Sequence, residues 1–289
     1  DSGELLSYRV AVFGLLGGLI LGTTWLYIGN MGLLTAVVFQ LSALIIFVGL
    51  ARIISQAGLA YCRAPVAPAV FTVNTLGSSV VGPSGLTALA LNFPWSADIR
   101  TFVMASAATG LKLAEVTRLE HRRLFWAIAI AIGATFTGSA ITVLYLAYAH
   151  GGINLGGWQF GGMTNYTGNW IVRNINSPEP VHIWHLSFAG LGAALMGLLT
   201  FLKNRFVGFP IHPSGLAVGL PHPVQIIWPS VFFAWLCKAL ILKYGGARLY
   251  VRLRPLFLGM VLGSFGTAGI WLIIDLCTGM TGNRLIYIG

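Results

Sequence analysis

The chain has 289 residues, of which 56% are hydrophobic and only 8% are charged. Soluble globular domains carry about 25% charged residues, so this composition excludes the soluble class and indicates an integral membrane protein. The formal net charge of +10 would suggest nucleic-acid binding in a soluble chain. In a membrane protein, cytoplasmic loops collect Lys and Arg, so we interpret the charge as a topology signal and expect no nucleic-acid partner.

The first predicted element is a pair of spans within residues 10–51, which contain no charged residue and no histidine. The stretch is long enough for two spans of about 20 residues each, and Gly29-Asn30 is the natural turn between them. Gly14, Gly18 and Gly22 recur every four residues in the first span. This spacing predicts a smooth helix face for close helix packing.

Residues 64–97 are again uncharged, but prolines and glycines interrupt them. The polar residues Asn74, Ser78 and Ser79 lie in the middle of the segment. Irregular backbone at membrane depth is tolerated where it is buried in protein or lines a wet cavity. We therefore predict a broken or re-entrant element here, with an ordinary hairpin at the membrane interface as the alternative.

The middle of the chain alternates connectors and spans. The run at 112–123, KLAEVTRLEHRR, predicts an amphipathic cytoplasmic connector over 110–123. Residues 150–180 are polar, rich in glycine and aromatic residues, and predict an extramembrane loop. Loops beyond about 15 residues are often functional. Further spans are predicted at 124–149, 181–202, 225–242 and 255–274.

The stretch FPIHPSGLAVGLPHP, residues 209–223, separates two of these spans. Its helix-capable part has about a dozen residues, too few to cross about 30 Å of hydrocarbon as a regular helix. We predict a second broken or re-entrant element over 206–224. The whole chain is then all-α, a single transmembrane domain over 1–289 with about six to eight spans.

The distribution of basic residues supports this layout. If Arg9 is cytoplasmic, thirteen of the 17 Lys and Arg fall on that side, including the predicted connectors 110–123 and 243–254. Of the ionisable residues, Lys238 lies within the predicted span 225–242, and Asp275 lies at the end of the apolar run 255–274. Such groups usually face a partner or a wet cavity; they either pair with each other or reach opposite interfaces.

Four histidines, His182, His185, His212 and His222, raise the question of a metal or haem site. No carboxylate or thiolate stands at a matching ligand spacing nearby, so we predict no metal and no cofactor. The sequence also has no nucleophile elbow, phosphate-binding loop, HExxH motif or paired carboxylates. We expect no enzymatic activity.

Several motifs occur in a characteristic order: AGLAYCRAP, GPSGLTALALNF, FPIHPSGLAVG and KALILKYGGARLYVRLRPLFLGMVLG. In this order they resemble the C-terminal half of a bacterial membrane protein family of unknown function that is related to the oligopeptide transporters. The family's Pro-Leu-His-Pro-x-Gly motif corresponds to Pro210, Ile211, His212, Pro213 and Gly215, although Phe209 stands where tryptophan is usual. The resemblance implies an inverted-repeat architecture and an inner-membrane location.

Two functions remain open at this stage. In the first, the two broken segments approach each other near the midplane and expose helix ends to a small solute. In the second, the chain is a non-catalytic structural or scaffold subunit that packs against other membrane subunits or a second copy of itself. The first reading predicts a substrate path formed by Asn74, Ser78, Ser79, His212, Pro213, Ser214 and Gly215.

Overall fold

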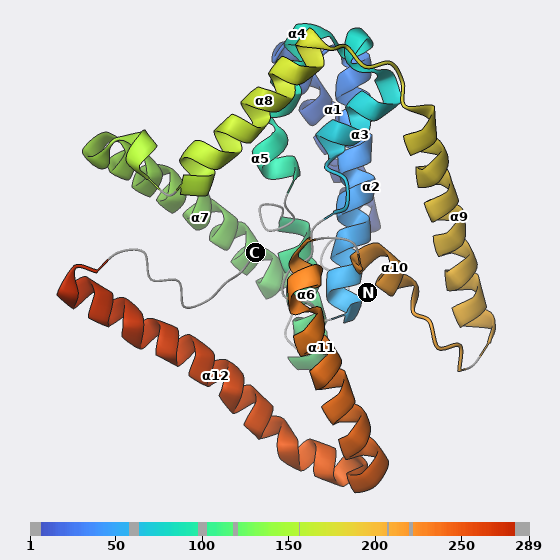
Figure 1. The fold of residues 1–289 in the computed structure, drawn as a ribbon, viewed down its shortest axis with the longest axis vertical. Helices are drawn as coiled ribbons and strands as arrows, with labels where there is room; N and C mark the ends of the chain where they lie inside the picture. Colours follow the sequence, from blue (N-terminus) through green and yellow to red (C-terminus); the bar gives the residue numbers. More distant parts are fainter. Residues whose placement is uncertain are drawn as a thin grey trace. The chain divides into compact units, whose positions relative to one another are not determined.

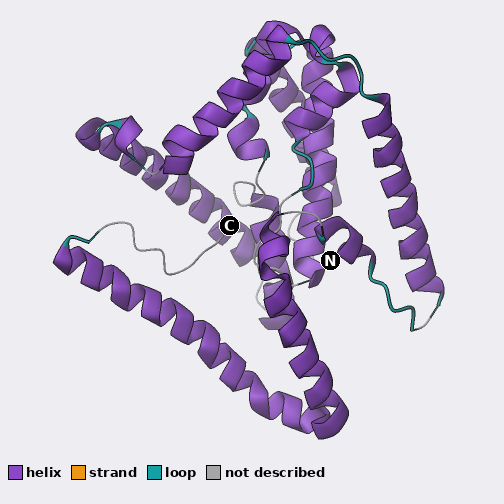
Figure 2. Ribbon diagram, in the orientation of Figure 1, coloured by secondary structure: helices purple, strands orange, loops and turns teal. Residues whose placement is uncertain are grey.

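The computed structural model describes residues 7–57, 64–97, 103–117, 121–155, 157–206, 208–219 and 222–280. Every regular element in these ranges is helical, which confirms the predicted all-α class (Figure 2). The chain divides into two compact units, Asp1–Gly219 and Leu220–Gly289.

The first unit begins with the predicted helical hairpin. Helix α1 (Tyr8–Ile28) and helix α2 (Leu33–Ala57) are joined by a turn at Asn30, the only described non-glycine residue with positive φ, at 63°. Asparagine tolerates this left-handed conformation better than most residues. The Met31 amide donates to the Leu26 carbonyl at 3.1 Å, and the Met31 side chain is fully buried. The turn therefore belongs to the core.

The glycine face of α1 contacts α2 only at one of its three positions. A Cβ added at Gly22 would lie 2.6 Å from the side-chain nitrogen of Gln40, whereas one at Gly14 or Gly18 would meet no atom within 4 Å. The Thr23 hydroxyl donates to Gln40 Oε1 at 2.9 Å beside this contact. Such interhelical bonds contribute about 0.6 kcal/mol within membranes. The packing role of Gly14 and Gly18 stays a prediction.

The broken element predicted over 64–97 is present. It consists of α3 (Pro68–Leu76), α4 (Ser78–Leu91) and the short α5 (Phe93–Ser96). The break between α3 and α4 is Gly77, with φ 81° and ψ 144°, and α4 is kinked at Gly82, with φ 69° and ψ 167°. Only glycine adopts such angles without strain. The glycines and prolines thus determine where this segment breaks.

The buried core of unit 1 surrounds this broken element. Phe39 of α2 is fully buried and meets the Trp95 ring edge-on, with ring centroids 5.6 Å apart. The Trp95 indole donates to Asn92 Oδ1 at 2.8 Å, so the polar atom of this large side chain is satisfied. Other members of the core are Leu26, Met31, Ala36, Ala69, Val73, Val81, Leu86, Ala88, Leu89, Phe93 and Ala97.

The segment 150–180 corrects one prediction, because most of it is helical rather than a loop. After α6 (Val103–Thr117) and α7 (His121–His150) come two short turns, η2 (Gly152–Asn154) and η3 (Gly157–Gly162), and then α8 (Met163–Asn176).

Tyr166, Trp170 and Asn174 recur every four residues along α8, and this spacing places them on one helix face. Tyr166 contacts Phe93, Trp170 packs on the core and Asn174 is buried. The glycine content obscured this period. Whether the segment lies outside the membrane stays a prediction.

Unit 1 ends with α9 (Ile183–Arg205) and the six-residue α10 (Pro213–Val218). Figure 1 shows the connection from α8 passing close to α4 before α9 turns away. The residues between α9 and α10 that are described are not helical, and α10 is far too short to span a membrane. The second predicted break is therefore also present.

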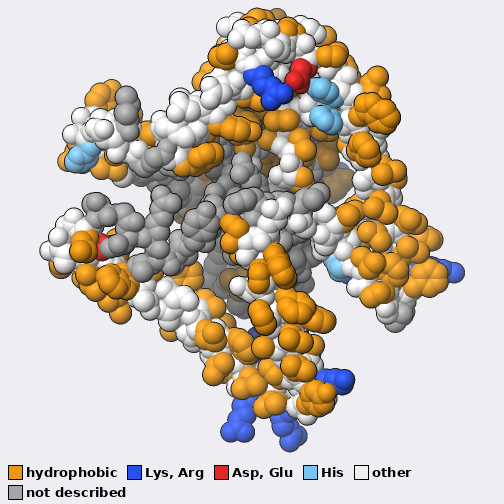
Figure 3. Space-filling model, viewed as in Figure 1, with side chains coloured by type: hydrophobic (Ala, Val, Ile, Leu, Met, Phe, Trp, Pro, Cys, Tyr) orange, Lys and Arg blue, Asp and Glu red, His pale blue; other side chains and the backbone are white. Residues whose placement is uncertain are grey.

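Unit 2 is a helical hairpin. Helix α11 (His222–Leu240) continues through a π-helical turn, η4 (Ile241–Gly245), into α12 (Gly246–Thr278). Gly246 has φ 67°, a value that ends one helix and redirects the chain. Figure 3 shows Lys and Arg side chains gathered around this bend, beside largely hydrophobic helix surfaces. The predicted connector 243–254 is thus formed by the bend and the first turns of α12.

Five helical stretches among the described residues are long and apolar enough to cross a membrane: Tyr8–Ile28, Leu33–Ser55, Leu124–His150, Ile183–Arg205 and Gln225–Thr278. The last has 54 residues and includes the bend at Gly246. A span needs only about 20 residues, so this stretch is long enough for two crossings. The chain is an integral membrane protein of helical type.

The break at Gly77 generates the first testable prediction. A Cβ there would lie 3.2 Å from the Val181 nitrogen and 3.3 Å from the Glu179 carbonyl oxygen, whereas Gly82 has open space around it. Alanine at positive φ costs about 1–3 kcal/mol at either site. Gly77→Ala adds a backbone collision, so we expect it to lower the apparent Tm in mild detergent more than Gly82→Ala does. Equal effects would contradict the contact.

Candidate functional site

A buried hydrogen-bonded contact joins the break at Gly77 to the connection between α8 and α9. The Ser78 amide and hydroxyl donate to the Glu179 carbonyl at 3.0 and 3.3 Å, and the Glu179 amide donates to Ser78 Oγ at 2.7 Å. The His182 amide donates to the Asn74 carbonyl at 3.1 Å. Ser78 is 2% exposed, so these bonds are shielded from competition with water. We call this set of contacts the Ser78–Glu179 clamp.

A polar cluster surrounds the Glu179 side chain. Its carboxylate contacts His182 Nε2 at 2.8 Å and Arg173 at 3.5 Å, and the His182 and His185 rings are 4.8 Å apart. The hydrogen bond from His182 is the main cause that lowers the pKa of Glu179 below its ordinary value. Partial desolvation opposes the shift, and the positive charges of His182 and Arg173 reinforce it. This cluster fixes the start of α9.

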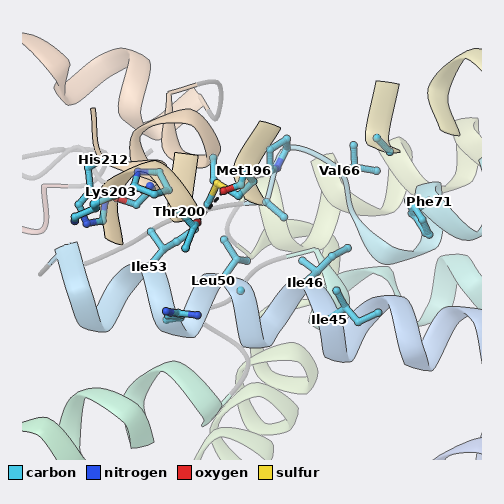
Figure 4. Close-up of a pocket in the computed structure, with 18 of the residues that line it drawn as sticks. Ile45, Ile46, Leu50, Ile53, Val66, Phe71, Met196, Thr200, Lys203 and His212 are labelled. Carbon is cyan, nitrogen blue, oxygen red and sulfur yellow. Dashed lines mark hydrogen bonds between the residues drawn. The ribbon is translucent and has the colours of Figure 1, made fainter. Parts of the chain in front are cut away.

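A cavity in unit 1 lies apart from this clamp, between α2, α9, α10 and the segment that precedes α3. Its volume is about 850 Å³, which is within the range of small-molecule sites, about 300–1,000 Å³. Ala189, Met196, Thr200 and Lys203 line it from α9, at spacings that place them on one helix face. Figure 4 shows Met196, Thr200 and Lys203 across the cavity from residues of α2, namely Ile45, Ile46, Leu50 and Ile53.

Basic groups line one end of this cavity. Lys203 and His212 lie together at that end (Figure 4), and Arg52 and Lys112 also contribute to the lining. The Lys112 ammonium donates to the Ser55 carbonyl, which ties α6 to the end of α2. The positive-inside layout assigns Arg52, Lys112 and Lys203 to the same side of the membrane. Their meeting around one cavity agrees with that layout.

The His212 ring is held in a defined orientation. Its Nδ1 accepts from the Ser214 amide at 3.2 Å and lies 2.6 Å from Ser214 Oγ, so His212 caps the short helix α10. Because Nδ1 accepts this amide, a neutral imidazole carries its proton on Nε2. Pro213, at the first position of α10, is buried. The HPS sequence therefore forms a corner of the cavity wall in which the His212 ring is held relative to α10.

The structure brings together only part of the predicted substrate path. His212, Pro213 and Ser214 line the cavity, while Gly215 is absent from its lining. Ser78 and the Asn74 carbonyl form hydrogen bonds in the clamp. Ser79 is exposed and is absent from the cavity lining. The predicted path did not include the residues of α2 and α9 that form the two facing walls of the cavity. The spacing of Met196, Thr200 and Lys203 marks one face of α9, but nothing in the sequence shows whether that face meets lipid or protein.

The remaining predicted site residues lie outside the cavity. In unit 2, Lys238 Nζ is 5.7 Å from the Tyr250 ring centroid. Asp275 follows Tyr250 by 25 residues in α12, or roughly 38 Å at 1.5 Å per residue, so Lys238 and Asp275 do not pair. Within the described ranges, His, Cys, Asp and Glu form no group of three or more that could hold a metal ion.

The helices and the cavity define the class: a polytopic helical membrane protein with interrupted elements next to a small-molecule-sized pocket. The chain belongs to a family of unknown function, DUF6785, whose model matches residues 1–287. No curated protein and no solved structure matches it. Membership in a family of unknown function is thereby confirmed, and the relationship to oligopeptide transporters remains a hypothesis.

The clamp predicts that two adjacent serines differ in importance. Ser78→Ala leaves the partly buried Glu179 amide without its acceptor, at a cost of about 1–3 kcal/mol. Ser79→Ala changes an exposed side chain and should stay within about 0.5 kcal/mol. Thermal unfolding of the two variants in the same detergent compares them directly. A Tm for Ser78→Ala equal to that of the wild type would contradict the clamp.

The lowered pKa of Glu179 gives a pH-dependent prediction. A carboxyl with a depressed folded-state pKa stabilises the fold above its ordinary pKa, and this stabilisation is lost as the pH falls through the depressed value. The pair is partly exposed, so the effect should be below about 1 kcal/mol. Glu179→Gln should therefore lower the Tm at pH 6, and the difference from wild type should shrink toward pH 3. A difference that does not change with pH would contradict this assignment.

Proposed function

We propose that this protein is an oligopeptide-transporter-like protein of the bacterial cytoplasmic membrane that moves a small solute and catalyses no chemical step. The proposed solute site is the cavity between α2, α9 and α10. The observation that carries the proposal is the meeting of this cavity with the second broken element, through His212, Pro213 and Ser214.

Transport requires a site that can open to either side. In secondary transporters, binding sites form at interrupted helices, whose backbone ends face the substrate. Here α10 is a six-residue helix next to non-helical chain, and it contributes side chains to the cavity. Because short elements with few packing contacts reorganise at low cost, α10 is the natural moving part. The clamped first break would be the fixed part.

The alternative function is a structural or scaffold subunit. It is favoured by α7 and α9, because the apolar spans of both helices contain no residue that is buried within the chain. Such surfaces are available to pack against a second copy or other membrane subunits as well as against lipid. Purification from the native membrane with unrelated subunits in fixed stoichiometry would support this alternative.

Filling the cavity tests the solute site. Ala189→Trp should obstruct the cavity, whereas Leu191→Trp, two residues away on an exposed face, should not. The full chain is reconstituted in proteoliposomes, and uptake of a defined library of di- to pentapeptides is measured by mass spectrometry. We expect Ala189→Trp to reduce uptake at least about tenfold, an activation barrier about 1.4 kcal/mol higher, with Leu191→Trp near wild type. No wild-type uptake above that of empty liposomes, or equal uptake by both variants, would contradict the proposal.

A further inference from the structure

We propose that the cavity of unit 1 binds an anionic amphiphile, with a phosphate or carboxylate group at its basic end and an alkyl body along its apolar walls. This inference names the substrate class for the solute site and rests on the proposed function given above. It is carried by the charge, the geometry and the length of the cavity.

The charge of the lining has one sign. Arg52, Lys112 and Lys203 contribute three cations, and the lining contains no acidic side chain among the described residues. Neither Arg52 nor Lys203 forms an ion pair with a carboxylate in the described part of the chain. Cations that line one cavity without an acidic side chain beside them favour an anion, and charge-assisted hydrogen bonds are stronger than neutral ones. The basic end is thus complementary to phosphate or carboxylate.

Two side chains of the lining, Lys112 and His212, are oriented by hydrogen bonds within the protein before any ligand binds. The bond of Lys112 to the Ser55 carbonyl anchors its ammonium, and two donors of that group remain. The cap formed by His212 Nδ1 fixes the imidazole, whose Nε2 has no hydrogen-bond partner in the described ranges. Preorganised donors reduce the entropy lost on binding. The site is therefore built rather than a diffuse basic surface.

The other end of the cavity is apolar and elongated. Figure 4 shows Phe71, Ile45 and Ile46 at the end away from Lys203 and His212. The lining extends along α9 from Ala189 to Lys203, a separation of 14 residues or about 21 Å of helix at 1.5 Å per residue. A bare inorganic anion would leave these walls without a partner. An alkyl body of several carbons would cover them and gain about 0.8 kcal/mol per buried methylene.

Two sources could supply such a ligand: an anionic phospholipid from the bilayer or a soluble amphiphile. Juxtamembrane basic residues attract anionic lipid headgroups, and the shared chemistry is an anion joined to an alkyl chain. The experiment must first show that the cavity binds such an anion. It must then distinguish a bilayer phospholipid from a soluble amphiphile as the ligand.

The experiment uses the full chain in phosphatidylcholine nanodiscs and measures binding of hexyl phosphate by calorimetry. Hexanol and inorganic phosphate serve as probes that lack the charge or the alkyl body. We expect hexyl phosphate to bind at least about tenfold more tightly than either probe. Lys203→Gln and Arg52→Gln should each weaken its binding about tenfold. Arg205→Gln, which removes a charge from the same end of α9 but outside the cavity, should change it less than about twofold.

The outcomes separate clearly. If phosphatidylglycerol added to the nanodiscs competes with hexyl phosphate, a lipid headgroup occupies the site; if it does not, a soluble amphiphile does, and both results uphold the inference. Hexanol or inorganic phosphate binding as tightly as hexyl phosphate would overturn it, as would equal losses in Arg205→Gln and Lys203→Gln. If Lys203→Gln and Arg52→Gln bind hexyl phosphate as tightly as the wild type while the wild type takes up peptides, this inference fails and the proposed function stands. Binding without uptake would overturn only the proposed function.

Discussion

The Ser78–Glu179 clamp is the constraint on which the rest of unit 1 depends. It joins two segments about a hundred residues apart in sequence through reciprocal backbone and hydroxyl hydrogen bonds around a buried serine. Gly77 makes this approach possible, because its positive φ turns the chain and its missing side chain lets the Glu179–Val181 backbone come within contact distance. In a membrane, unpaired backbone groups cost several kcal/mol, so a broken helix persists only where such partners are supplied. The clamp supplies them and fixes the point from which α9 begins.

The position of α9 in turn determines the cavity. Helix α9 provides one wall, α2 the facing wall, and the HPS corner of α10 closes the basic end. The two interruptions in the chain therefore have different roles. At the first, Ser78 is buried and hydrogen-bonded to Glu179, which suits a fixed framework. The second carries exposed polar groups at a cavity mouth, which suits recognition of a ligand. The basic residues Arg52, Lys112 and Lys203, which the predicted topology assigns to one side of the membrane, all line this cavity.

The sequence was informative where backbone chemistry alone decides the structure. The α1–α2 hairpin and both breaks follow from uncharged length, from Asn30 and from glycine and proline positions, and all three are present. Residues 150–180 were misjudged because glycine content outweighed the four-residue period of Tyr166, Trp170 and Asn174. Within the predicted path, Asn74 and Ser78 looked equivalent to His212 by polarity, but tertiary contacts separate them. The walls of the cavity could not be predicted, because apolar residues on α2 and α9 carry no sign of which face meets lipid and which meets protein.

Cysteine cross-linking in native membranes tests the clamp most directly. Asn74→Cys and His182→Cys are introduced together into a chain whose Cys62, Cys237 and Cys277 are replaced by serine, and Ser79→Cys with His182→Cys is the matched pair. The His182 amide lies 3.1 Å from the Asn74 carbonyl oxygen, so the two Cα atoms should be within the roughly 7 Å that a disulfide requires. We expect rapid disulfide formation at 74 and 182 under mild oxidation and little at 79 and 182. No cross-link at 74 and 182, or equal cross-linking of both pairs, would contradict it.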